Sequence, residues 1–113
     1  MAEAKKSLKP IPPTLRGKKR YVKFELNSDV SLFEKDVKFA IWNTFSRIYG
    51  EKGVAEQKLW LIKWFPDKNE GILRCALEKL EEVKAGLLFV KEVQKEPVIP
   101  ILKKVSGSIK KLS

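Results

Sequence analysis

Histidine is absent from this 113-residue chain, and cysteine occurs once, as Cys75. The chain therefore lacks the commonest metal ligand and the commonest general acid or base at neutral pH. A single cysteine cannot form an intramolecular disulfide or a cysteine-based metal site. With no histidine to activate it, Cys75 is expected to be a small packing residue inside a strand rather than a nucleophile.

Long hydrophobic runs are also missing. No apolar stretch approaches the roughly 20 residues needed to cross a bilayer, and the first residues lack the apolar core of a signal peptide. We expect a soluble, cytoplasmic protein with no membrane partner. The sequence also contains no Gly-rich phosphate loop, nucleophile elbow or cluster of metal ligands. We therefore expect no catalytic residue, no bound cofactor and no metal site in the protein itself.

Basic residues are abundant, and they are concentrated at the two ends. The formal net charge is +10, of which residues 1–20 carry +6 and residues 92–113 carry +3. The 71 residues between them carry only +1. With 43% hydrophobic residues, the chain should form one globular domain. A nearly neutral body with basic ends is typical of proteins that bind nucleic acids.

The first half of the chain predicts a strand, a helix and a second strand. Residues 20–27 alternate between apolar and polar side chains, as in a half-buried strand. Ser31 and Glu34 match a capping box, which predicts a helix starting at about Leu32. Gly50 is placed to end that helix in a left-handed turn. Residues 56–65 are rich in aliphatic and aromatic residues and predict a strand with Trp60, Ile62 and Trp64 on one face.

The second half predicts the remaining elements of one small domain. Residues 72–76 suit a strand antiparallel to the preceding one, residues 77–91 a helix, and residues 97–105 an edge strand that tolerates proline. The order β-α-β-β-α-β is the α+β, ferredoxin-like (split β-α-β) pattern, a four-stranded antiparallel sheet with two main helices on one face. We expect a basic arm over 1–19, the domain over 20–105 and a basic tail over 106–113.

Arg74 is a cation between apolar residues in the middle of the predicted sheet. Two interpretations are open. In the structural one, Arg74 pairs with an acidic residue or extends to solvent; in the functional one, it contacts a phosphate or a base of RNA. The third strand has no aromatic residue and does not match the RNA-recognition motif. The sheet face opposite the helices is therefore expected to be apolar and covered, by the tail or by another protein.

Three segments in the same order resemble one family. Residues 12–21 (Pro-Pro-Thr-Leu-Arg-Gly-Lys-Lys-Arg-Tyr), residues 59–63 with 71–75, and residues 105–111 (Val-Ser-Gly-Ser-Ile-Lys-Lys) resemble protein component 2 of ribonuclease P, most of all its archaeal members. The first and last motifs are specific, and the central one alone is weak. Ser108 stands where the family often has threonine.

The resemblance implies a protein that assists a catalytic RNA in removing 5′ leaders from precursor tRNA. It also implies that magnesium binds the RNA subunit, and that the partners are ribonuclease P RNA, precursor tRNA, a TIM-barrel-like protein subunit in a heterotetramer, and other ribonuclease P proteins. The residues expected to contact RNA are ten. Nine are basic, namely Arg16, Lys18, Lys19, Arg20, Arg74, Lys103, Lys104, Lys110 and Lys111, and the tenth is Tyr21.

Two other hypotheses remain open on the sequence. The chain is a protein-interaction module with no direct RNA role, for which Trp42, Trp60 and Trp64 are the interface candidates, although core packing is the default for tryptophan. Alternatively, it is a small enzyme that acts on a phosphorylated substrate through Arg74 or the arm. The missing histidine and the lack of a positioned nucleophile argue against the enzyme.

Overall fold

The computed structural model describes residues 18–112 of the chain. The main elements are β1 (Lys19–Asn27), α1 (Glu34–Gln57), β2 (Trp60–Phe65), β3 (Glu70–Ala76), α2 (Leu80–Leu87) and β6 (Ile99–Ser106). Shorter elements are the 3-10 turns η1 (Leu77–Lys79) and η2 (Ile109–Lys111) and the strands β4 (Glu92–Val93) and β5 (Glu96–Pro97). The predicted order of main strands and helices is confirmed, whereas the β4–β5 hairpin was not predicted.

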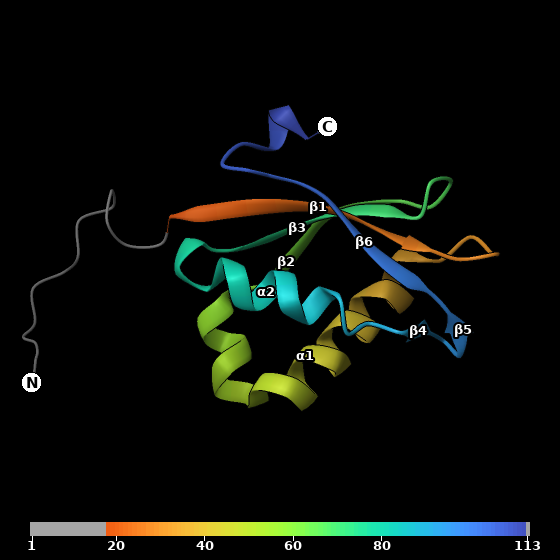
Figure 1. The fold of residues 1–113 in the computed structure, drawn as a ribbon, viewed down its shortest axis with the longest axis horizontal. Helices are drawn as coiled ribbons and strands as arrows, with labels where there is room; N and C mark the ends of the chain where they lie inside the picture. The colour runs from red at the N-terminus through yellow and green to blue at the C-terminus, as the bar shows by residue number, and fades with distance from the viewer. Residues whose placement is uncertain (1–17, 113) are drawn as a thin grey trace, which may run out of the picture.

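The four long strands form one antiparallel sheet in the order β2-β3-β1-β6. Both helices lie on one side of this sheet, and the C-terminal turn lies on the other side (Figure 1). The predicted four-stranded antiparallel sheet with two helices is therefore confirmed. β6 is an edge strand, as expected for a segment containing proline.

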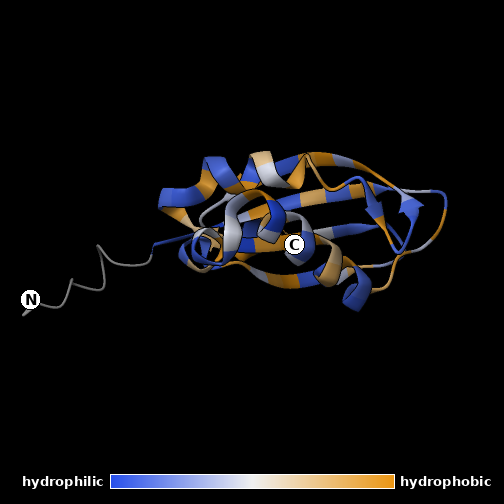
Figure 2. Ribbon diagram, turned by 90° about the horizontal axis from the view of Figure 1, so that it is seen from below, coloured by the Kyte–Doolittle hydropathy of each residue, from blue (hydrophilic) through white to orange (hydrophobic). Residues whose placement is uncertain are grey.

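The hydrophobic core lies between the helices and the sheet. Val22, Phe24 and Leu26 alternate along β1 and are fully buried. They belong to one cluster with Phe45 of α1 and Leu87 of α2. Hydrophobic and hydrophilic residues alternate along the strands and helices (Figure 2), and this pattern gives each element one face for the core.

The start of α1 differs from the predicted capping box. The helix begins at Glu34, and its N-cap, Phe33, has an extended backbone with no side-chain cap. The Ser31 hydroxyl instead donates to the Pro66 carbonyl (2.8 Å), and Asn69 Oδ1 accepts from the Leu32 amide (2.9 Å). The β2–β3 turn thus binds the β1–α1 loop, and this tertiary contact prevents the local cap.

Gly50 ends the first of two helical segments that a kink joins into α1, so the prediction that it ends a helix is confirmed for that segment. Its φ of 74° and ψ of 173° are not helical, and helical structure resumes immediately and continues to Gln57. This conformation is essentially restricted to glycine. The predicted strand over 56–65 is therefore too long at its start, because its first residues belong to the helix. The predicted helix over 77–91 is likewise too long, since α2 ends at Leu87.

A register shift in β2 overturns the predicted facing of its tryptophans. Leu61 pairs with Leu73 and Lys63 pairs with Ile72, so Ile62 is the extra residue of a bulge. Because one extra residue reverses the alternation of side chains, Leu61 and Trp64 both face the core while Trp60 does not. Trp64 is 8% exposed and Trp60 is 61% exposed.

The sheet face opposite the helices is partly covered by the chain itself. Ile72 is fully buried and Leu112 is 2% exposed, although neither belongs to the main core cluster. Leu112 follows η2, which lies on this side of the sheet (Figure 1). The C-terminal turn therefore covers part of the face, which agrees with one of the two covers expected from the sequence. The expectation that this face is apolar is wrong, because Lys23 and Lys103 form ion pairs with Glu70 on it.

Candidate nucleic-acid interface

The basic arm meets the sheet at the first residues of β1. Arg16 lies outside the described residues, as do residues 1–17 generally. The Lys18 carbonyl accepts a hydrogen bond from the Leu77 amide at 2.9 Å, which fixes the entry to β1 against the end of β3. Lys18 is exposed, and Lys19 and Arg20 are half-buried. Arg20 Nη1 donates to the Lys19 carbonyl at 2.9 Å.

Lys19 lies close to two other cations. The pKa of Lys19 is lowered, first by partial desolvation and then by the positive charges of Lys58 and Arg74. Lys58 caps the C-terminal end of α1 in a left-handed conformation, with φ of 52°. A positive corner therefore forms where β1 begins, β2 begins and β3 ends.

Arg74 has no acidic partner among residues 18–112, which contradicts the interpretation of Arg74 as one half of an ion pair. Its Nε is buried without a hydrogen-bond partner within that part of the chain. Arg74 stands opposite Tyr21 of β1 and opposite Trp60 of β2. The structure thus places Tyr21 and Arg74, both predicted to contact RNA, next to Trp60, which was predicted to contact protein.

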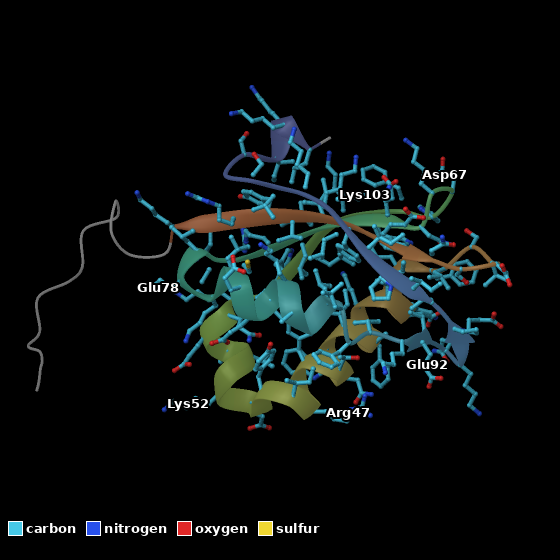
Figure 3. All side chains as sticks on the ribbon, viewed as in Figure 1. Arg47, Lys52, Asp67, Glu78, Glu92 and Lys103 are labelled. Carbon is cyan, nitrogen blue, oxygen red and sulfur yellow. The ribbon has the colours of Figure 1, made fainter. Side chains whose placement is uncertain are left out.

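The lysines of β6 and the tail form a second group on the same side of the sheet. Lys103 Nζ pairs with Glu25 at 3.1 Å and with Glu70 at 4.0 Å, and it lies on the side away from the helices (Figure 3). Lys104 stands opposite Lys23 and is exposed. Because Lys103 has internal partners, its charge is partly neutralised, whereas Lys104 adds to the positive charge.

The tail lysines lie on the C-terminal turn. Lys110 and Lys111 belong to η2, and both are exposed. This turn lies on the side of the sheet that the helices leave open (Figure 1). The structure therefore brings the tail lysines and the β6 lysines to one side of the molecule, whereas the positive corner lies at the end of the sheet where β1 begins.

The three tryptophans have different environments. Trp64 Nε1 donates to the Leu32 carbonyl at 2.8 Å, and its ring lies 6.1 Å from that of Phe24, so it is a core residue. Trp42 is 56% exposed, so the core-packing default is wrong for it. Trp42 and Trp60 line an apolar groove of about 380 Å³ between α1 and β2, with Ile41, Leu59, Leu61, Leu73 and Lys38.

The described residues contain no evident catalytic or metal centre. Cys75 is fully buried, and burial raises the pKa of its thiol to about 11, so the reactive thiolate is disfavoured. Within residues 18–112, no group of three or more acidic or cysteine side chains is placed to hold a metal ion. None of the helices in this range is long and apolar enough to cross a membrane.

Lys58 is the residue of the positive corner that sequence reasoning missed. The predicted strand over 56–65 made Lys58 an ordinary strand residue, and only the left-handed cap of α1 brings it beside Lys19 and Arg74. The exposure of Trp60 was missed for a related reason, because the bulge at Ile62 has no sequence signal.

The fold and this surface define a class: a small α+β protein with two helices on one face of an antiparallel sheet and a positive corner at one end of that sheet. Residues 20–113 match the model of the Rpp14/Pop5 family, and the chain belongs to that family. The resemblance seen in the three sequence segments is therefore confirmed.

Curated relatives agree with this family, and a solved structure shares the fold. The chain is 41% identical to ribonuclease P protein component 2 of Pyrococcus horikoshii, over 95% of this chain and 89% of the relative. It is 39% identical to the protein of that name from Methanocaldococcus jannaschii, over 92% and 76% of the two chains. A chain of the yeast ribonuclease MRP structure superposes with a TM-score of 0.65 at 15% identity, over 81% of this chain and 76% of that one, which is a likeness of fold alone.

Proposed function

We propose that this chain is a ribonuclease P protein component that binds the RNA subunit and assists it in removing 5′ leaders from precursor tRNA. The observation that carries the proposal is the similarity of about 40% identity, over nearly the whole chain, to archaeal proteins of that name. The basic ends and the positive corner support an RNA-binding role, because phosphate contacts supply much of the affinity for RNA.

The fold and the location follow from the same assignment. The strand order β2-β3-β1-β6, with both helices on one face, supports a ferredoxin-like topology. We assign the chemistry to the RNA subunit and its magnesium ions, and the location to the cytoplasm. The protein would act by holding RNA through Arg16, Lys18, Lys19 and Arg20, and more weakly through Lys104, Lys110 and Lys111.

Protein partners are also part of the proposal. We assign the α1 side of the apolar groove, with Trp42, to the TIM-barrel-like subunit of ribonuclease P, within a heterotetramer. Trp42 is more than half exposed beside this groove, and large exposed aromatic residues next to apolar hollows are typical of protein interfaces. This groove is also the observation that favours the second candidate function, a protein-interaction module with no direct RNA role.

The test is cleavage of precursor tRNA by ribonuclease P RNA at limiting magnesium. The TIM-barrel-like subunit is added first, and then this protein, either as wild type or with Arg16, Lys18, Lys19 and Arg20 all changed to Ala. We expect the wild type to restore cleavage and the quadruple variant to fail. Equal rescue by both would favour the interaction module, and no rescue by the wild type would overturn the proposal.

A further inference from the structure

A row of three side chains crosses the sheet on the face that the helices leave open. Tyr21 of β1 stands directly opposite Arg74 of β3, and Arg74 stands directly opposite Trp60 of β2. Directly opposed residues of antiparallel strands leave from the same face, with Cβ atoms about 5 Å apart. A guanidinium is therefore placed between two aromatic side chains, and the outer one, Trp60, is 61% exposed.

Two lysines add uncompensated charge to this row. Lys19 is two residues before Tyr21 on β1, so it shares the face and lies diagonal to Arg74. Lys58 lies just before β2, close enough for its charge to act on Lys19. Elsewhere on this face Lys23 and Lys103 pair with Glu70. Within residues 18–112, no carboxylate forms an ion pair with Lys19, Lys58 or Arg74.

The guanidinium of Arg74 is the group of this row that can bind an anion. Its Nε is buried and has no hydrogen-bond partner within residues 18–112, so a ligand can reach this side chain only through its Nη groups. A phosphate satisfies a guanidinium with two parallel hydrogen bonds, and it also neutralises neighbouring ammonium groups. The exposed indole beside it offers a flat surface on which a base can stack.

We propose that Trp60, Arg74 and Tyr21, with Lys19 and Lys58 beside them, bind an unpaired nucleotide of RNA. The base stacks on the Trp60 indole, and the phosphate lies against Arg74 and the two lysines. An unpaired nucleotide is required, because bases inside a duplex do not expose their faces for stacking. This inference rests on the proposed RNA-binding function and adds a site and a ligand to it.

The experiment measures binding of the full chain to a single-stranded oligouridylate and to an RNA duplex of equal length. Trp60→Ala is expected to weaken single-strand binding about five-fold or more, with little effect on the duplex. Arg74→Gln is expected to weaken single-strand binding and to reduce its salt slope by about 0.7. The matched controls are Phe39→Ala, which removes an exposed aromatic side chain of α1, and Lys52→Gln on the helical side (Figure 3). Both controls should bind like the wild type.

A second measurement needs no variant. Ultraviolet crosslinking of the wild-type chain to the same oligouridylate, followed by mass spectrometry, should place crosslinks on Trp60 or Tyr21. Crosslinks confined to the arm or the tail would overturn the site, whatever the variants do.

The outcomes separate this site from the proposed function. If Trp60→Ala and Arg74→Gln bind like the wild type while the quadruple arm variant loses affinity for ribonuclease P RNA, this site is refuted and the proposed function stands. If Trp60→Ala impairs only binding of the TIM-barrel-like subunit, Trp60 contacts protein and the site is again refuted. If the wild type binds neither the oligouridylate nor ribonuclease P RNA, both proposals fail.

Discussion

Gly86 is a residue whose lack of a side chain lets the two helices meet. A Cβ atom at this position would lie 2.6 Å from Cζ and 2.8 Å from Cε2 of Phe45. Phe45 is fully buried in the core cluster, so its ring has little room to move. Close contact between α1 and α2 therefore depends on this glycine.

We expect Gly86→Ala to lower the free energy of unfolding by about 1–3 kcal/mol, measured by urea denaturation. Alanine at an exposed helical position would instead stabilise the helix by about 1 kcal/mol relative to glycine. The sign of the change thus separates packing from helix propensity. In a Phe45→Leu background, where the smaller side chain leaves space, the loss should shrink. A more stable Gly86→Ala variant would contradict this account of the packing.

The tryptophans show how far residue-scale prediction extends. Trp64 is a core residue, as the default for tryptophan predicts. Its indole N–H can be buried because it donates a hydrogen bond to the Leu32 carbonyl. Trp42 and Trp60 depart from that default, and the sequence could name them only as interface candidates beside Trp64. The exposure of Trp42 follows from its place on α1, whereas that of Trp60 follows from a bulge two residues later.

At the scale of elements, Gly50 joins two helical segments into α1. Nothing lies within 4 Å of a Cβ built on Gly50, so a substitution there tests the backbone alone. We expect Gly50→Ala to lower the free energy of unfolding by about 1–3 kcal/mol, because its backbone conformation is open essentially only to glycine.

The matched control for Gly50 is Ala55→Gly, an exposed helical position in the same element. It should lose only about 1 kcal/mol through helix propensity. Circular dichroism of both variants reports whether the segment after the kink remains helical. A Gly50→Ala variant as stable as the wild type would mean that the chain adopts a different path at this point.

Periodicity was sufficient to predict the main elements, and tertiary contacts decided the rest. The alternation in β1 and the apolar spacing of the helices are local signals, so their order and type were predicted correctly. The cap at Ser31 failed because Pro66 and Asn69 take up the polar groups of that loop. The positive corner was predicted only in part, since Lys58 reaches it through the left-handed end of α1.

At the scale of the whole molecule, the charge distribution makes RNA binding dependent on salt. Each phosphate contact with single-stranded RNA adds about 0.7 to the slope of log affinity against log salt. If the four arm cations Arg16, Lys18, Lys19 and Arg20 all contact phosphates, changing them to Ala should reduce the slope by about three. Binding of ribonuclease P RNA measured across a salt series tests this expectation. An unchanged slope would assign the electrostatic contacts to the rest of the surface.

The sheet order also determines how the molecule can fold. β1 comes first among the strands, yet its two neighbours, β3 and β6, follow much later in the chain. Pairing across such long separations closes large loops, which slows folding relative to helical proteins of similar length. During synthesis β1 is complete before either neighbour exists, so both of its edges lack partners in the nascent chain. β1, one of the two inner strands of the finished sheet, is therefore the strand that waits longest for a partner while the chain is being made, and an unpaired strand favours aggregation.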